Sequence, residues 1–476
     1  MASKSKRAKL NPQNNTKVFM YWAVSVFIIK IAIIFRIEGI NTGYGSGTYF
    51  VDGSWLGADG ENYLTGYFAL LKDGIFSADS ILNYWPAGYP LLILFLSFFG
   101  KSWVLTTLSI FQSIVFSYAA YFFATELSKT RLRKFAHISL IIILLNPTLS
   151  LNSMAVGYES LTASGFLICL ALIIKSFVVR EEIKFVKYLI INSFVFSFLA
   201  FVQPRLILSG LIIQIIWIII WKGARAGALL VALSIAITLF FPATLIYRNN
   251  KATGLTSIST NLGVTMNIGA GDKATGGYMV KDFGVPCDLS GSTVDQDNKR
   301  IRCVLEWYLA NPNKAAKLFF NKSIYFWSPW YGPEANGTMA RNPWLKFHPL
   351  SETAKTENGF KMVFGATGKF ISWVWISGSL ALLSLGFLAL RRRGGDSTLL
   401  AWLLLTPVLL NALSSMATIG DNRFRIPTLT LSLLLQLFGL YSIFSKKIFR
   451  RGLEGEVKLS RGINWSKKQV GDNLQP

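Results

Sequence analysis

Residues 57–90 read GADGENYLTGYFALLKDGIFSADSILNYWPAGYP and lie between two apolar segments. The stretch contains the carboxylates Asp59, Glu61, Asp73 and Asp79 beside several aromatic side chains. Acidic groups close to a membrane span are unusual, because an ionisable side chain is costly to place in lipid. We therefore expect this stretch to form a loop at the membrane surface, and we take it as the first candidate for a functional site.

The composition is that of a membrane protein. Of the 476 residues, 52% are hydrophobic and 15% are charged, and the mean hydropathy is +0.43. By comparison, about 25% of the residues of a soluble domain are charged. Apolar runs of about 18 residues or more recur along the chain and predict transmembrane helices, whose backbone polar groups are satisfied internally. The sequence thus predicts an all-α polytopic membrane protein with about 10 (9–12) transmembrane helices.

The apolar runs place the predicted spans at 18–35, 103–127, 135–149, 160–174, 185–202, 206–221, 226–246, 362–390, 399–416 and 426–444. Their boundaries are good to about 2–4 residues. Residues 90–99 are apolar but short for a span, so they are predicted to lie at or dip into the outer interface. The first apolar run is not followed by a small-residue cleavage site, which favours an uncleaved first helix.

The basic residues set the expected orientation. If the N-terminus is cytoplasmic, alternation of the spans places every short basic loop on the cytoplasmic side, as the positive-inside rule requires. These loops contain Lys129, Arg131, Arg133, Lys134, Arg180, Lys184, Lys187, Lys222, Arg225, Arg391, Arg392, Arg393, Lys446, Lys447, Arg450 and Arg451. They account for much of the formal net charge of +24 without a nucleic-acid partner. We expect a multi-pass protein of the inner membrane with both termini cytoplasmic.

This topology divides the chain into five parts. They are a cytoplasmic basic tail at 1–17, an N-terminal transmembrane module at 18–246 with an outer loop at 37–101, an extracytoplasmic loop at 247–361, C-terminal transmembrane helices at 362–445 and a cytoplasmic tail at 446–476. Nearly all candidate functional residues fall on the extracytoplasmic side. Helical spacing of apolar residues predicts helices over 295–327, interrupted at Asn311–Pro312, and the second of them is basic and aromatic, as suits the membrane interface.

Three cysteines are too few for a disulfide framework. Cys169 falls in an apolar span and is interpreted as an inert core residue. Cys287 and Cys303 share the long outer loop, where an oxidising environment would permit a disulfide. Two unrelated free thiols explain the same residues nearly as well, so the sequence leaves both interpretations open.

Asp59 stands at the start of a predicted short helix over 59–72, with Tyr63 on one of its faces. An N-cap role and a catalytic role explain Asp59 equally well as a single observation. Its neighbours favour catalysis, because Asp52 or another nearby charge, together with desolvation, would raise the pKa of a carboxyl group toward that of a useful base. Asp52 is equally interpreted as a solvated loop residue.

Two further outer positions carry charge. Glu159 opens the span at 160–174, where an ionisable residue is a functional candidate, although it would also be explained as a helix-capping acid or as a side chain reaching the surface. Arg423 and Arg425 face outward before the last span and break the positive-inside trend. Two arginines at that place would bind a phosphate, or would anchor the chain to lipid headgroups. Arg36 and Arg205 are further outward cations.

The order of several motifs resembles a known superfamily. The motifs are an apolar helix ending in Arg36, Asp59–Tyr63, Pro86-Ala-Gly-Tyr-Pro90, Asn146-Pro147, Tyr158-Glu159-Ser160, Ser259-Thr-Asn-Leu-Gly263 with Asn267-Ile-Gly-Ala-Gly271, and Arg423-Phe-Arg-Ile-Pro427. This order is similar to that of the GT-C glycosyltransferases, in particular the branch with bacterial relatives of protein O-mannosyltransferases and the lipid A aminoarabinose transferase. The resemblance covers roughly residues 19–444.

The resemblance implies a GT-C-like enzyme whose donor is a sugar on a polyprenyl phosphate. Asp59 would be catalytic, Tyr63, Glu159 and Asp52 would bind substrate, and Arg423, Arg425 and Arg36 would hold the donor phosphate. Gly60 stands where the mannosyltransferases have a second acid, and Tyr84 and Trp85 stand where the aminoarabinose transferases have a charged pair. Neither sugar is therefore carried over to this chain.

We expect an inverting hexosyl- or pentosyltransferase of the cell envelope that moves a sugar from a polyprenyl-phosphate donor to a hydroxyl of a glycan, lipid or protein acceptor. No cofactor is certain, and a divalent metal bound by Asp59, Asp52 or Glu159 is possible. The alternatives are a transporter or lipid-sugar flippase, another cell-surface polysaccharide polymerase or ligase, and a non-catalytic membrane scaffold. A transporter would favour ionisable residues near the midplane and internal repeats, and neither is clear in the sequence.

Overall fold

The computed structural model describes residues 12–36, 49–51, 54–56, 60–277, 284–329 and 365–444. Within these residues, nine helices are long and apolar enough to cross a membrane. They are α1 (Pro12–Arg36), α5 (Val104–Ser128), α8 (Glu159–Val179), α9 (Glu182–Val202), α10 (Ile207–Lys222), α11 (Ala224–Thr253), α19 (Ala366–Arg391), α20 (Gly395–Ala417) and α21 (Ile426–Phe444). The predicted all-α polytopic architecture is confirmed at this level.

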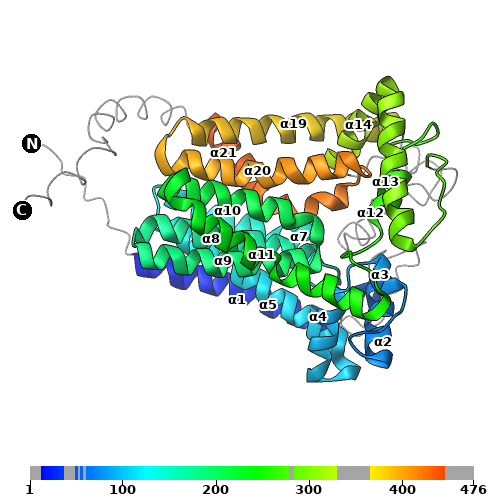
Figure 1. Ribbon diagram of the computed structural model, residues 1–476. Helices are drawn as coiled ribbons and strands as arrows, with labels where there is room; N and C mark the ends of the chain where they lie inside the picture. The colour runs from blue at the N-terminus through cyan, green and yellow to red at the C-terminus, as the bar shows by residue number, and fades with distance from the viewer. Residues whose placement is uncertain are drawn as a thin grey trace, which may run out of the picture.

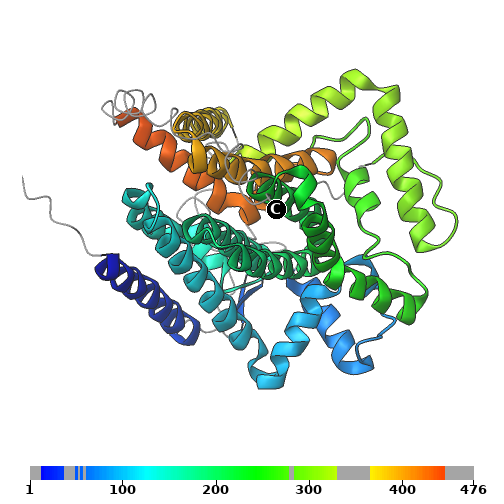
Figure 2. The ribbon, with the colours of Figure 1, turned by 60° about the vertical axis from the view of Figure 1, so that its left-hand side comes forward.

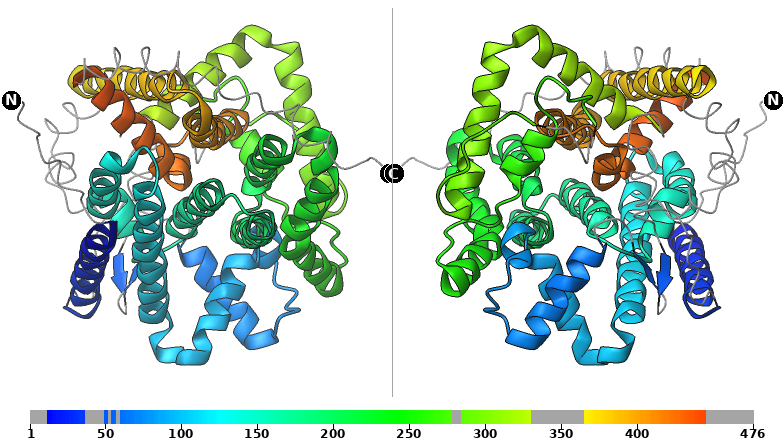
Figure 3. Two further views of the ribbon diagram at one scale, coloured as in Figure 1. Left: turned by 90° about the vertical axis from the view of Figure 1, so that its left-hand side faces the viewer. Right: turned by 90° about the vertical axis from the view of Figure 1, so that its right-hand side faces the viewer.

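The long helices form one bundle (Figure 1), and their side chains form a large buried core. In the views along the bundle, α1, α11 and α19 lie at the rim (Figure 3). Among the helices, α8 is buried along most of its length, and it packs against α5, α9 and α21. Polar side chains also pack inside the bundle. For example, the Gln214 amide of α10 donates a hydrogen bond to the Thr238 hydroxyl of α11 at 3.0 Å. Such interhelical hydrogen bonds, with close packing, hold helices together in lipid.

One of the predicted spans differs from the structure. Residues 135–149 form two helices, α6 (Ala136–Leu145) and α7 (Pro147–Asn152), instead of a single span. Pro147 has no N–H group and disfavours helical geometry in the preceding residue, so the first helix ends there. The Asn146 side chain then caps α7 by accepting a hydrogen bond from the Leu149 N–H at 3.0 Å.

The basic turns of the bundle gather at one end, which we call the basic end. Phe135, after the basic turn that follows α5, contacts the rings of Phe438 and Tyr441 near the end of α21. The guanidinium of Arg393, from the turn after α19, lies 5.8 Å from the same Phe135 ring. This grouping agrees with the positive-inside pattern. The orientation of the bundle in a membrane stays a prediction.

The other end, the loop end, carries the short helices. They are α2 (Gly60–Asp73), α3 (Ile81–Tyr84), α4 (Gly88–Leu96), α12 (Leu262–Ile268), α13 (Thr293–Ala310) and α14 (Pro312–Trp327), with 3-10 turns η1 (Ser97–Phe99), η2 (Lys101–Trp103), η4 (Pro204–Leu206) and η5 (Asn422–Arg425). Another such turn, η3 (Arg133–Phe135), lies at the basic end. Figure 2 shows the sharp corner between α13 and α14, where the sequence predicts an interruption at Asn311–Pro312.

The described part of the long outer loop forms a compact outer lobe, which we define as residues 255–277 and 284–329. A disulfide joins Cys287 to Cys303, so the disulfide interpretation holds and the free-thiol alternative is wrong. The Asn267 side chain accepts a hydrogen bond from the Val285 N–H at 2.7 Å. The buried Asp297 carboxylate accepts one from the Gly263 N–H at 2.8 Å, and burial raises its pKa despite that bond.

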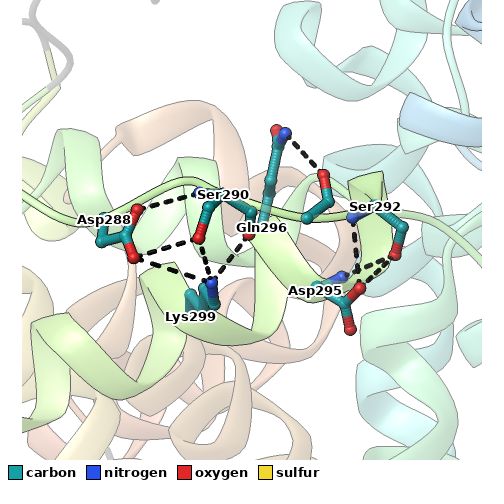
Figure 4. Close-up of polar contacts among 7 residues, drawn as sticks. Asp288, Ser290, Ser292, Asp295, Gln296 and Lys299 are labelled. Atoms are coloured by element: carbon teal, nitrogen blue, oxygen red, sulfur yellow. Dashed lines mark hydrogen bonds and ion pairs between the residues drawn. The ribbon is translucent and has the colours of Figure 1, made fainter.

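The start of α13 is fixed by a polar network (Figure 4). Ser292 and Asp295 form a reciprocal capping box, in which each side chain accepts from the backbone N–H of the other. Lys299 donates to the Ser290 hydroxyl at 2.6 Å and lies 3.8 Å from the Asp288 carboxylate. Hydrogen bonds from Ser290 and from Ser292 lower the pKa of Asp288 and of Asp295, respectively. These contacts hold the segment before α13 against the helix.

Replacing both Cys287 and Cys303 by serine is expected to destabilise the outer lobe by about 3 kcal/mol, because the cross-link closes a short loop and restricts the unfolded chain. Limited proteolysis of the protein in detergent should then cut the segment before α13 much faster than in the parent. The matched Cys169→Ser variant, whose thiol is buried and free, controls for the loss of a cysteine. Equal cleavage rates in the parent and the double variant would contradict the assignment.

A small sheet at the loop end was not predicted. Strand β1 (Tyr49–Val51) pairs antiparallel with β2 (Ser54–Leu56), and β2 pairs parallel with β3 (Ala155–Val156). In the second pairing, Trp55 is opposite Ala155 and Leu56 is opposite Val156. The sheet therefore joins the first outer loop to the segment that precedes α8.

Candidate functional site

The small sheet aligns the two segments that carry the predicted acids. Asp52 and Asp59 themselves lie outside the described residues. On the described side, Leu56 pairs with Val156 three residues before Glu159, and Gly60, the first residue of α2, is buried. Asp59 thus falls in the sequence between β2, which ends at Leu56, and α2, which begins at Gly60.

Tyrosine and tryptophan rings surround this junction. Tyr63 is 3% exposed, and its ring centre lies 5.0 Å from that of Tyr89, 6.0 Å from that of Trp85 and 6.4 Å from that of Tyr158. The rings come from α2, α4, the turn before α4 and the residue before α8. Tyr63 is therefore on the buried face of α2, as its helical position predicts. Tyr63, Tyr89 and Tyr158 are buried against one another, and Trp85 is half-buried, so the cluster is a packed support from which the Trp85 ring is the accessible surface.

Tyr89 connects the aromatic cluster to the sheet. Its hydroxyl donates to the Gln112 side-chain oxygen at 3.2 Å and accepts a hydrogen bond from the Gly157 N–H at 2.8 Å. The Gln112 amide in turn donates to the Ala155 carbonyl at 2.8 Å. The preceding residue must be small, because a methyl group on Gly88 would overlap the Phe201 carbonyl oxygen. This explains why a Gly-Tyr pair stands in the proline motif.

Changing Tyr89 to Phe is expected to lower the stability of the protein by about 1–3 kcal/mol, because a buried N–H and a buried amide lose a partner at once. Thermal unfolding in detergent measures the loss. Tyr118→Phe is the matched control, since the Tyr118 side chain is exposed on α5. A Tyr89→Phe variant as stable as the control would show that the Tyr89 hydroxyl does not hold the sheet.

Glu159 is the first residue of α8 and is 2% exposed, so its side chain does not reach the outer surface. The surface explanation offered by the sequence is therefore wrong for this residue. Its place in the first helical turn suits a carboxylate, because the helix dipole is positive there. A buried acid beside the aromatic cluster remains a candidate for binding a substrate.

A cation–ring stack links this junction to the last span. The Arg205 guanidinium carbon, in η4, lies 5.7 Å from the Tyr158 ring centre and 4.4 Å from that of Phe424 in η5. Its Nη2 atom donates to the Tyr158 hydroxyl at 3.4 Å. The arrangement brings together the residue before α8, η4 and η5. The sequence identifies Arg205 as an outward cation, but nothing in its spacing indicates that it sits between these two rings.

Arg423 and Arg425 lie on either side of Phe424. The Arg423 guanidinium carbon is 5.1 Å from the Phe424 ring centre, and its backbone N–H donates to the Asp421 carboxylate at 2.8 Å. Arg425 donates through Nη1 to the Trp327 carbonyl at 2.7 Å, and Trp327 is the last residue of α14. One donor of Arg425 therefore satisfies a carbonyl that the end of the helix leaves free.

The outer lobe positions the turn before Arg423. Methyl groups on Gly269 or Gly420 would overlap the Thr418 carbonyl oxygen or the backbone of Lys322, so the chains meet without side chains between them. Lys322 is fully buried there and donates to the Tyr308 hydroxyl at 2.8 Å. Burial lowers the pKa of Lys322 to about 7 and raises the pKa of Tyr308 to about 12.

The first span approaches the same sheet. Arg36 is the last residue of α1, and its side chain lies outside what the structure describes; Ile34 packs against Met154 and Ala155 beside β3. Lys30 of α1, which the sequence reasoning missed, is 2% exposed and donates to the Ser153 hydroxyl at 2.8 Å. A lysine inside an apolar span is itself the sequence signal for such a contact.

The described residues contain no group of three or more His, Cys, Asp or Glu side chains that would hold a metal ion. Since Asp52 and Asp59 are outside those residues, a divalent metal at this site stays a prediction. The described geometry brings Tyr63, Tyr158 and Glu159 to one junction, and Arg205 connects it to the Phe424 ring, which Arg423 also contacts. No protein-family model, curated protein or solved structure matches the chain.

Proposed function

We propose that this protein is an inverting glycosyltransferase that moves a sugar from a polyprenyl-phosphate donor to an acceptor hydroxyl at the outer face of the membrane. The main support is the junction at the loop end, where the sheet next to Asp59, the buried Glu159 and the Arg205–Phe424 stack come together. Such a junction offers a carboxylate, flat rings and cations in one place. These are the groups that transfer of a sugar from a lipid phosphate requires.

In the proposed reaction, Asp59 accepts the proton of the acceptor hydroxyl. The acceptor oxygen attacks the anomeric carbon, a new glycosidic bond forms, and the bond between that carbon and the phosphate oxygen breaks. The polyprenyl phosphate leaves with the bonding electrons, and Arg423, Arg425 and Arg36 stabilise the charge that develops on it. Because the displacement occurs in one step, the product has the opposite anomeric configuration.

Tyr63, Glu159 and Asp52 bind the sugar or the acceptor in this proposal. The half-buried Trp85 ring packs on the apolar face of a sugar ring with Tyr63 behind it, and the carboxylate of Glu159 accepts hydrogen bonds from sugar hydroxyls. The donor is membrane-bound, so its polyprenyl chain stays among the lipids while its head reaches the loop end. A glycan, lipid or protein on that side of the membrane is the acceptor.

The function is tested with the purified protein in lipid nanodiscs. Radiolabelled hexoses and pentoses on polyprenyl phosphate are supplied together with a membrane extract as the source of acceptors. We expect release of free polyprenyl phosphate and transfer of label to one acceptor class, with inversion established by nuclear magnetic resonance of the product. If no donor is turned over, while a flippase assay shows movement of the intact lipid-linked sugar across the bilayer, the protein is a transporter and the proposal is wrong.

A further inference from the structure

We propose that Arg205 is an anion-binding residue of this site and that its ligand is the phosphate of a polyprenyl-phosphate lipid. This inference rests on the proposed function, because it deepens the description of the same donor. Arg205 lies on η4, between α9 and α10, which is far in sequence from the arginines of η5. It therefore brings a third part of the chain to the donor.

The first argument is that most N–H donors of Arg205 make no hydrogen bond within the described residues. A guanidinium offers five N–H donors. Within the described residues, Arg205 makes one side-chain hydrogen bond, the 3.4 Å contact with Tyr158, and its buried Nε has no acceptor. Arg425, by contrast, already donates one hydrogen bond to the Trp327 carbonyl at 2.7 Å. A buried donor without an acceptor costs free energy, and a ligand that supplies the acceptor recovers that cost.

The second argument is the orientation of the group. Arg205 lies over Phe424 at 4.4 Å and near the Tyr158 ring at 5.7 Å, and these two rings restrict where its planar fork can point. A fork that is held in place loses less conformational freedom when it binds, and its parallel N–H bonds match a phosphate in a bidentate manner. Cation–ring contacts leave the N–H edge of the guanidinium available for such a ligand.

The third argument is the nature of the surrounding charge. The guanidinium of Arg423 also lies against Phe424, at 5.1 Å, so two cations share one ring. The described residues place no carboxylate in an ion pair with Arg205. Two neighbouring cations are best stabilised by an anion that accepts hydrogen bonds from both.

The test measures binding of farnesyl phosphate, a short polyprenyl phosphate, to the detergent-solubilised full-length protein by isothermal titration calorimetry. Farnesol, which lacks the phosphate, reports on the apolar tail alone. The variants are Arg205→Gln and the matched control Arg225→Gln, which removes one exposed arginine at the basic end. Each variant is first compared with the parent by thermal unfolding, and Arg205→Lys keeps the charge but not the fork.

We expect Arg205→Gln to weaken farnesyl phosphate binding by about tenfold or more, since it removes charge-assisted hydrogen bonds. Farnesol binding should be unchanged, Arg225→Gln should bind like the parent, and Arg205→Lys should recover part of the loss. If parent and Arg205→Gln bind farnesyl phosphate equally, Arg205 is not an anion-binding residue, and the proposed function stands without it. If the parent does not bind farnesyl phosphate, both proposals are overturned. Displacement of the probe by an equal concentration of phosphatidylglycerol assigns the phosphate to ordinary membrane lipid and overturns this inference alone.

Discussion

Asp59→Asn is expected to lower the turnover number for sugar transfer by about 10²–10⁴-fold, the usual contribution of general acid–base catalysis. Asparagine has nearly the same shape as aspartate and is also a good N-cap, so the start of α2 should be preserved. The amide cannot accept the proton of the acceptor hydroxyl at neutral pH. Donor binding should therefore be retained while the chemical step slows, and kcat should fall much more than KM changes.

The matched control for this experiment is Asp73→Asn, at the other end of the same helix. Asp73 is exposed, and its carboxylate accepts a hydrogen bond from the Ser77 hydroxyl at 3.3 Å. The control removes one carboxylate from the first outer loop without touching the junction. Folding of both variants is checked by thermal unfolding. Full transfer activity in a folded Asp59→Asn protein would remove Asp59 from the mechanism.

Gly386→Ala is expected to destabilise the protein by about 3 kcal/mol or more, because a side chain is forced into a closely packed contact. A methyl group on Gly386 of α19 would overlap the Leu435 carbonyl oxygen of α21. Gly439 of α21 makes the reciprocal contact with Leu382 of α19. The overlapping atoms belong to backbone, so the two helices must separate for the methyl group to fit. Small residues permit this close approach between membrane helices.

Gly378→Ala is an internal control for that change, since it is the same substitution in the same helix. Among the described residues, apart from the two chain neighbours and the backbone of α19 itself, no heavy atom lies within 4 Å of a Cβ placed on Gly378. Alanine also favours helix over glycine, so this variant should be neutral or more stable by about 0.5–1 kcal/mol. Melting temperatures of the two variants in one detergent give the comparison. Equal melting temperatures would mean that α19 and α21 do not meet at Gly386.

Hydropathy and charge were sufficient to predict most of the helices. Long apolar runs are decisive because the bilayer leaves the backbone no other partner, so the spans agree with the structure within a few residues at most boundaries. Residues 135–149 show where this reasoning is incomplete. Their apolar composition predicts one span, whereas the missing N–H of Pro147 and the cap formed by the Asn146 side chain divide them into two helices.

The candidate site was predictable only in part. Glu159 is detectable because an acid at the edge of a span is rare, and Tyr63 because helical spacing places it on one face. Strands of two or three residues such as β3 leave no readable period in a sequence. The position of Arg205 over Phe424 depends on packing between parts of the chain that are far apart, and that packing has no local signal. The Cys287–Cys303 bond was one of two open alternatives for the same reason.

The parallel pairing of β2 with β3 has a consequence for how the protein is made in the cell. A ribosome releases Leu56 well before Val156, its strand partner, and α5, α6 and α7 are synthesised in between. Proteins emerge N-terminal part first, at about 5–20 residues per second. During that interval β2 has an open edge, which can pair with other chains. Assembly of the junction must therefore wait until translation has reached the start of α8.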